Sequence, residues 1–165
     1  MPIVDKTPGQ ALTMAVAEIK RTRPDARRGV FVEFRGAVSQ SEAVAARLWR
    51  VIGFVGDCAG APTNIPSNAL LWAAGTEEAW TFVARGDGAT LVRNGNKRTA
   101  LVAHAASSSA TRHYAAKNGA TEFVLQVDED VCVDPQGETA YGARVTATLR
   151  ENAMTQTVRG CAARF

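Results

Sequence analysis

The sequence lacks the features that assign a chain directly to a special class of protein. It contains no run of about 18 apolar residues, which a transmembrane helix requires. No apolar core of a signal peptide follows its first residues. Hydrophobic residues make up 46% of the 165 residues and aromatic ones only 7%, a balance too apolar for a disordered chain. We therefore expect one soluble, globular domain with a core of Ala, Val and Leu.

Motifs for catalysis and for cofactors are missing as well. The chain has no G-x-S-x-G, H-E-x-x-H or Walker sequence, so it predicts no cofactor and leaves open whether the protein is an enzyme. Its three cysteines, Cys58, Cys132 and Cys161, include no C-x-x-C pair, so no zinc site is predicted. Three is an odd number, and at least one thiol stays outside any internal disulfide.

The chain also lacks the strong positive charge of a dedicated nucleic-acid-binding protein. The formal net charge is only +3, and the basic excess lies mainly in the first third. The simpler interpretation is a solvated end of a helix, where cations suit the negative pole of the helix dipole. The alternative is a patch that contacts nucleic-acid phosphates. Its candidate residues are Arg21, Arg23, Arg27 and Arg28.

The first third of the chain predicts a helix, a strand and a second helix. A helix start at 7–10 precedes apolar residues at helical spacing over 12–19, and Pro24 ends that helix. Alternating residues at 30–34 predict a strand. A capping box opens the segment 39–53, whose apolar spacing predicts the second helix.

The rest of the chain predicts an antiparallel β meander. A segment rich in Gly and Pro, 54–69, forms a seam within the domain. From residue 70 onward, short alternating strands are joined by tight turns, a pattern typical of a barrel or a sandwich. The predicted class is therefore α+β, with one domain over 1–165. It divides into an N-terminal segment (1–53), the seam (54–69) and a β region (70–165), with the helices covering an open end or edge of the sheet.

Two histidines form the sharpest local feature. If the loop 107–110 is symmetric, His104 and His113 lie directly opposite each other on one face of a hairpin. Such a pair can share a metal ion or a proton, although the sequence does not show a third metal ligand. The simpler interpretation is a solvent-facing pair, or a slip of register that separates the two residues.

Polar positions of separate strands carry further candidates. Arg112, Arg144, Arg150 and Arg159 either converge on one anionic ligand or only solubilise the outside of the sheet. We take Arg112 and Arg144, with the two histidines, as the candidate ligand-binding set. The acidic run 128–130, continued by Asp134 and Glu138, is not an EF-hand, and a solvated loop explains it.

The segment from Trp72 to the C-terminus resembles an uncharacterised family of bacterial envelope proteins, many of them lipoproteins. The resemblance covers about the last 90 residues and depends on four motifs in order. The first two are Gly75-Thr76-Glu77-Glu78-Ala79-Trp80 and Cys132-Val133-Asp134, and Tyr141 and Gly160-Cys161 follow. It departs from the family pattern at Glu78 and Gly142, where the family has Pro, and at 135–137, where it has Met-Ser-Gly.

The resemblance implies a small barrel-like domain, a disulfide between Cys132 and Cys161, and export from the cytoplasm. It implies no known activity. The first 70 residues have no counterpart in it, and no lipobox cysteine is present. Without the resemblance, a cytoplasmic location is the expectation.

Four functions remain open from the sequence, of which the last is a small α+β enzyme or ligand-binding cone with an N-terminal helix lid, a fold that hosts many unrelated functions. The first is a non-enzymatic binding or interaction module for a protein or a small ligand, because no catalytic set is recognisable. The second is a small enzyme or metal-binding protein that uses the face of His104 and His113. The third is a nucleic-acid-binding protein that uses the arginine-rich first third. The ligand and the oligomeric state are not determined by the sequence.

Overall fold

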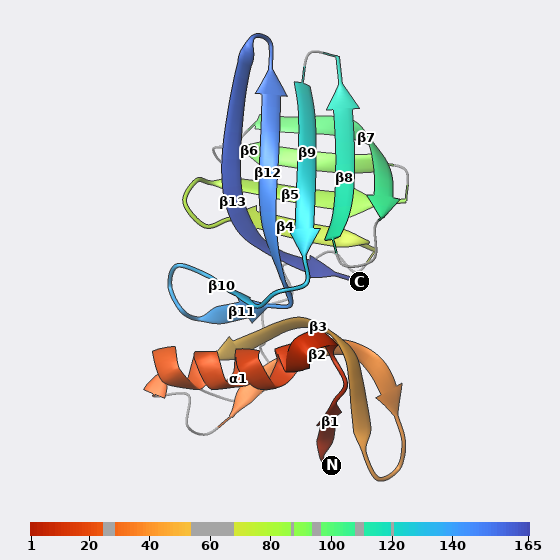
Figure 1. The fold of residues 1–165 in the computed structure, drawn as a ribbon, viewed down its shortest axis with the longest axis vertical. Coiled ribbons are helices and arrows are strands. Elements are labelled where there is room, and N and C mark those ends of the chain that lie inside the picture. The colour runs from red at the N-terminus through yellow and green to blue at the C-terminus, as the bar shows by residue number, and fades with distance from the viewer. Residues whose placement is uncertain (25–28, 54–67, 87, 94–96, 108–110, 120) are drawn as a thin grey trace.

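The chain folds into a β-barrel stacked on a smaller layer of one helix and a second sheet (Figure 1). The computed structural model describes residues 1–24, 29–53, 68–86, 88–93, 97–107, 111–119 and 121–165, and at 97–107 and 111 it describes the backbone alone. The predicted β meander is confirmed, and the described part is mostly strand. The predicted seam at 54–69 lies almost entirely outside the described residues.

The N-terminal helix forms where the sequence predicts it. A short 3₁₀ turn, η1 (Pro8–Gln10), leads into α1 (Ala11–Thr22). Leu12, Ala15 and Ile19 are buried, because residues three and four apart share the helix face that packs on the sheet. The Thr7 hydroxyl accepts a hydrogen bond from the Leu12 backbone N–H at 3.1 Å, which satisfies one of the free donors at the helix start.

The predicted second helix is wrong, because this segment forms strand β3 (Ala43–Gly53). It pairs with β2 (Val30–Val38), the strand predicted just before it. The register between them shifts twice, between Glu33 and Phe34 and between Arg35 and Gly36. Each shift leaves an extra residue in β3 and reverses which face the following side chains occupy. The apolar residues of β3 therefore follow one another at intervals of two or three residues. In the sequence this irregular spacing resembles the periodicity of a helix.

The capping box predicted at Ser39 closes a turn between two strands and does not begin a helix. The Ser39 hydroxyl accepts hydrogen bonds from the backbone N–H groups of Ser41 and Glu42, at 3.3 and 3.1 Å. It closes the turn between β2 and β3, where the Ser39 N–H donates to the Glu42 carbonyl at 2.9 Å. Serine satisfies free backbone donors equally well in a tight turn and at a helix start, so the motif alone cannot distinguish the two.

The barrel is built from strands that pair antiparallel all the way around. Its spatial order is β12-β13-β4-β5-β6-β7-β8-β9, and β12 also pairs with β9, which closes the ring. The strands are β4 (Leu71–Gly75), β5 (Trp80–Arg85), β6 (Gly88–Arg93), β7 (Lys97–Ser107), β8 (Thr111–Asn118), β9 (Thr121–Asp128), β12 (Ala143–Glu151) and β13 (Met154–Arg164). Alternate residues of β4, β5, β6, β8, β9, β12 and β13 fill the interior. Closure removes the free edges that an open sheet would expose to other chains.

The second sheet joins segments from both halves of the chain. After β9 the chain leaves the barrel and forms β10 (Cys132–Val133) and β11 (Thr139–Tyr141) before β12 returns to it. β11 pairs with β3, and β1 (Ile3–Asp5) pairs with β3 in parallel. The predicted division into an N-terminal and a β region is therefore crossed by this hairpin, which places α1 and β3 beneath the barrel (Figure 1).

A disulfide joins the two parts. Cys132 of β10 and Cys161 of β13 are bonded, as the resemblance implies, and their Cα atoms lie 5.3 Å apart. Both cysteines are buried, and beside them the rings of Trp72 and Tyr141 stack with centroids 5.1 Å apart. Burial raises the pKa of the Tyr141 hydroxyl, and the charge of Arg50 opposes the rise. The bond holds the β10–β11 hairpin against the outside of the barrel.

Two paired glycines make room for the largest ring inside the barrel. Gly75 and Gly160 lie opposite each other on β4 and β13. A Cβ atom on Gly75 would lie 2.5 Å from Trp80 Nε1, and one on Gly160 would lie 2.9 Å from Trp80 Cζ2 and 2.0 Å from the Ala74 carbonyl oxygen. The indole of Trp80 therefore packs directly over bare backbone. Its other contact is edge-on to Phe123, with ring centroids 5.5 Å apart.

We expect Gly160→Ala to destabilise the barrel by about 1–3 kcal/mol, because the added methyl group overpacks a site without free space. Urea unfolding measures the change. Gly88→Ala is the matched control, because the nearest atom to its added Cβ is a carbonyl oxygen 3.8 Å away. Equal stability losses in the two variants would show that the packing of Trp80 over glycine is unimportant.

We expect the ionisation of the Asp5 carboxylate to make the free energy of unfolding depend on pH. Burial raises its pKa, but the hydrogen bonds from the N–H and O–H groups of Thr7 and Thr13 lower it more, at 2.6–3.0 Å. Its stabilisation is present above the unfolded pKa of about 3.9 and is lost as the pH falls through the lower folded value. At neutral pH, Asp5→Asn should lower the free energy of unfolding by about 1 kcal/mol, the usual effect of replacing a capping residue.

Unfolding of the native chain and of the Asp5→Asn variant, followed from pH 7 downward, tests this directly. The difference in unfolding free energy should shrink toward zero in strong acid. A difference that stays constant over the whole pH range would contradict the assignment.

Candidate ligand-binding groove

An open groove of about 710 Å³ lies between the outside of the barrel and the helix layer. Its barrel wall consists of β12 and β13, and α1 and the segment that carries β10 form the other side. The turn between β4 and β5 adds two residues to the rim. The lining residues are Met14, Glu18, Thr76, Glu77, Asp130, Val131, Cys132, Val133, Pro135, Arg144, Val145, Thr146, Arg159 and Gly160. Its volume is in the range of small-ligand sites.

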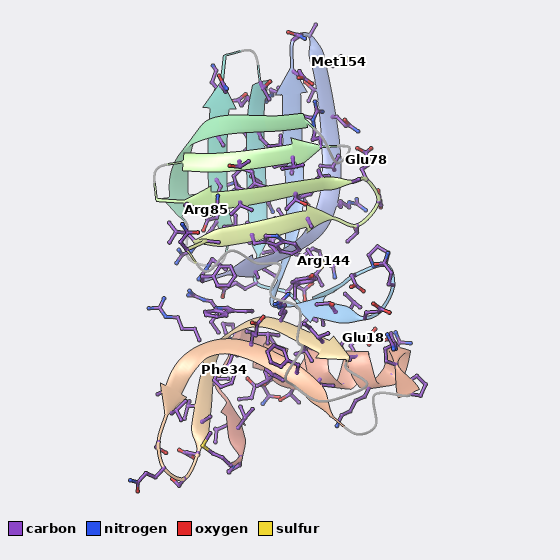
Figure 2. All side chains as sticks on the ribbon, turned by 180° about the vertical axis from the view of Figure 1, so that it is seen from behind. Glu18, Phe34, Glu78, Arg85, Arg144 and Met154 are labelled. Carbon is purple, nitrogen blue, oxygen red and sulfur yellow. A yellow bond between two sulfur atoms is a disulfide. The ribbon has the colours of Figure 1, made fainter. Side chains whose placement is uncertain are left out.

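The barrel wall of the groove carries two arginines on neighbouring strands. Arg159 lies directly opposite Thr146, and Arg144 lies opposite Cys161, two residues further along β13. Because alternate residues share a face, both guanidinium groups lie on the outer face of the barrel. Figure 2 shows Arg144 at the barrel end nearest the helix. The disulfide from Cys161 attaches β10, on the other side of the groove, to the barrel at the position that pairs with Arg144.

The two arginines differ in how their charge is used. The Arg144 guanidinium lies 3.4 Å from an Asp130 oxygen and donates to the Val131 carbonyl at 3.2 Å. The exposed Arg159 guanidinium has no ion-pair partner among the described residues, although its backbone carbonyl accepts a hydrogen bond from the Thr76 N–H at 3.2 Å. Glu77, which also lines the groove, is exposed and has no such partner within the same part of the chain. The groove thus offers one cation and one carboxylate for an external ligand.

The helix side of the groove is more apolar. Met14 is 54% exposed and lies on the side of α1 that faces away from its packed residues. Val131, Val133 and Pro135 add further apolar surface. Glu18, on the same helix, accepts a hydrogen bond from Arg21 that lowers the pKa of its carboxyl group. A ligand in the groove would meet charges on the barrel side and apolar side chains on the helix side.

The histidine pair has a different register from the predicted one. His104 pairs with Ala115 and His113 pairs with Ala106, so the two are not directly opposite. The turn between β7 and β8 is centred one residue later than a symmetric loop at 107–110 would place it. A shift of two in the pairing leaves both positions on one face but makes them diagonal neighbours. His113 is exposed and does not line the groove.

The other predicted arginines do not join the groove. Arg112 pairs with the buried Val127 and therefore lies on the interior face of the wall, whereas Arg144 lies on the outer face. Arg150 is on the outer face but forms an ion pair with Glu122 at 3.0 Å, across to β9. Of the four arginines, the structure brings together only Arg144 and Arg159.

The acidic run is divided among separate partners and does not surround one point. Glu129 pairs with Arg164 at 2.8 Å, and Asp130 lies beside Arg144. Asp134 accepts a hydrogen bond from the Glu138 N–H at 2.8 Å. Among the described residues, no group of three or more His, Cys, Asp or Glu side chains is placed to hold a metal ion.

The arginine-rich first third is partly described. Arg21 pairs with Glu18 on the same helix, and Arg23 pairs with Glu138 at 2.8 Å. Both guanidinium groups are thus neutralised locally, which leaves less charge for phosphates. Arg27 and Arg28 lie outside the described residues. No helix in the described segments is long and apolar enough to cross a membrane.

Sequence reasoning missed two buried arginines. Arg50 of β3 is 2% exposed and forms an ion pair with Glu33 of β2. Arg164 of β13 is 7% exposed. Burial lowers the pKa of its guanidinium, the Glu129 carboxylate opposes this, and the charges of Arg47 and Arg112 lower it further. In the sequence each of these two arginines is surrounded by apolar residues. A single arginine in such a segment is the signal that could have predicted its burial.

No protein-family model, no curated protein and no solved structure matches the chain.

Proposed function

We propose that this protein is a non-catalytic binding module whose groove holds an extended peptide-like ligand with groups of both charges. The observation that supports the proposal most is that an unpaired guanidinium, that of Arg159, and an unpaired carboxylate, that of Glu77, line the same groove of 710 Å³. A ligand carboxylate would pair with Arg159, whose planar guanidinium suits it, and a ligand ammonium would pair with Glu77. Apolar side chains between them would lie on Met14 and Val133.

The chemistry of the groove favours binding over catalysis. Among the described residues its lining contains no histidine and no lysine, and its one cysteine is held in the disulfide. In the same part of the chain the hydroxyl groups of Thr76 and Thr146 form no hydrogen bond with a carboxylate that would activate them as nucleophiles, and that of Thr76 donates to the Arg159 carbonyl at 3.5 Å. The charged groups that remain suit recognition, because each supplies hydrogen bonds and a direction to the bound ligand.

The disulfide supports a second proposal, on location. Disulfides persist in oxidising compartments and are rare in the cytosol of most organisms. The bond between Cys132 and Cys161 therefore supports the export and envelope location that the resemblance implies. A binding module in such a compartment would meet peptides and cell-wall fragments rather than nucleotides.

We expect a capped pentapeptide with one glutamate and one lysine at its two ends to bind in the groove, and Arg159→Glu to weaken its binding about 10- to 100-fold. This factor corresponds to the loss of one charge-assisted interaction of about 1.5–3 kcal/mol. Isothermal titration calorimetry gives the affinities, and backbone amide shifts locate the site.

The matched control is Arg85→Glu, which makes the same charge change elsewhere on the barrel, where Arg85 donates to Asn68 at 2.9 Å (Figure 2). A peptide that carries glutamine at both ends should bind no better than the Arg159→Glu variant binds the charged peptide. Equal weakening by both arginine variants would show that only net charge matters and would overturn the groove as the site.

We expect the protein prepared under oxidising conditions to present one thiol to an alkylating reagent before reduction and three after it. The disulfide occupies two of the three cysteines and leaves Cys58 as the remaining thiol. Intact mass spectrometry counts the alkyl groups, and digestion locates the bonded pair. Three reactive thiols before reduction would contradict both the bond and the location.

A further inference from the structure

Strand β2 has one edge that is not paired within the described part of the chain. It pairs with β3 alone, and no described backbone group outside β3 forms a hydrogen bond with its nine residues. Both register shifts leave their extra residue in β3, so β2 itself is regular. It contains no proline and no lysine, which often protect a free edge. This free edge of β2 is therefore a template on which another strand can pair.

The side chains of β2 are covered on one face only. Val30, Val32 and Phe34 pack against the core of the helix layer. At the other end of the strand Val38 is 70% exposed, next to the turn that joins β2 to β3. Figure 1 shows this turn at the end of the molecule opposite the barrel. A partner at the free edge would thus meet backbone groups along the whole strand and an exposed valine at its end.

The charges of β2 are not balanced within one chain. Arg50 of β3 lies opposite Glu33 and forms an ion pair with it. Arg47 of β3 lies opposite Arg35, so two cations are neighbours, an arrangement that disfavours pairing. The exposed Arg35 guanidinium has no ion-pair partner among the described residues. A carboxylate placed beside Arg35 on the free edge would offset the repulsion.

A second copy of β2 supplies this carboxylate in one register. Two identical antiparallel strands in one sheet are related by a two-fold axis normal to the sheet, which keeps each face on its own side. Paired positions then share a face, so the axis passes through a residue. With the axis at Phe34, the middle of β2, all nine residues pair. An axis at Glu33 or at Arg35 would place two like charges directly opposite each other.

The register about Phe34 also matches the side chains of the two copies. Glu33 of each copy lies opposite Arg35 of the other, so the favourable pair forms twice. A carboxylate has two oxygens, and Glu33 can accept from this arginine and keep its ion pair with Arg50. The exposed Val38 lies opposite Val30 of the other copy, which covers it. Charge and apolar surface are therefore complementary along the whole strand.

We propose that the protein forms a symmetric dimer in which the free edges of two β2 strands pair antiparallel about Phe34. The helix layers of the two copies then share one continuous sheet. No residue of β2 lines the groove. The dimer is therefore independent of the function proposed for the groove, and either proposal can fail without the other.

Sedimentation velocity of the full chain measures its oligomeric state. We expect the native protein to pass from monomer to dimer as its concentration rises through the micromolar range. Hydrogen exchange read by mass spectrometry locates the interface, because amides of 30–38 should exchange more slowly as the dimer forms, whereas those of β12 should not change. A native chain that is still monomeric at about 1 mM, where even weak complexes form, would overturn the proposal and leave the edge to a different protein. A dimer without slower exchange at 30–38 would overturn it as well.

A change of charge at Arg35 tests the register. Arg35→Glu should weaken the dimer about 10- to 100-fold, because both cross-strand pairs change from opposite to like charges. The variant should fold, because Arg35 is exposed and its charge already opposes that of Arg47. Arg35→Lys keeps the cation and should keep the dimer.

The matched control is Arg85→Glu, which makes the same charge change on β5 of the barrel and should dimerise as the native chain does. Equal weakening by Arg35→Glu and Arg85→Glu would show that net charge alone controls association. That result, or an Arg35→Glu variant that dimerises as well as the native chain, would overturn the proposed interface.

Discussion

The disulfide between Cys132 and Cys161 is the constraint on which the arrangement of the rest depends. The barrel closes on itself through the pairing of β9 with β12, and the helix layer has its own core. The bond joins them by fixing β10 to β13. The stacked rings of Trp72 and Tyr141 fill the space beside it. Because the groove has one wall on each side of this junction, its width is set by the bond.

Several of the residues that carry the resemblance are explained by packing. Gly75 and Gly160 give Trp80 its space, and the two cysteines and Tyr141 form the junction between the layers. These positions are fixed by geometry and leave the ligand undetermined. Of the groups that we assign to binding, Glu77 belongs to the first motif of the resemblance, and Arg159 directly precedes the last. The same fold could thus present different ligand groups on an unchanged frame.

Sequence reasoning predicted the strands from residue 70 onward because their alternation is regular and Gly or Asn marks the turns. Gly119 and Asn152, for example, adopt the positive φ that such turns require. It failed at β3, where two irregularities in register disguise a strand as a helix. It also failed for the pairing of the histidines, since register depends on the turn geometry. The groove could not be predicted, because it joins residues from α1, β10, β12 and β13, which only the tertiary fold brings together.

The position of the β10–β11 hairpin has a consequence for the order of assembly. Because β9 and β12 are neighbours in the barrel, residues 129–142 are topologically one long hairpin loop of the barrel. The N-terminal sheet, however, is completed only when β11 from that loop pairs with β3. During synthesis the first strands of the chain therefore wait for residues made much later, whereas the meander from β4 to β9 can pair as it emerges. The N-terminal sheet is first in the sequence, yet β3 acquires its partner β11 only after the meander from β4 to β9 has been made, and β13 then closes the barrel against β4.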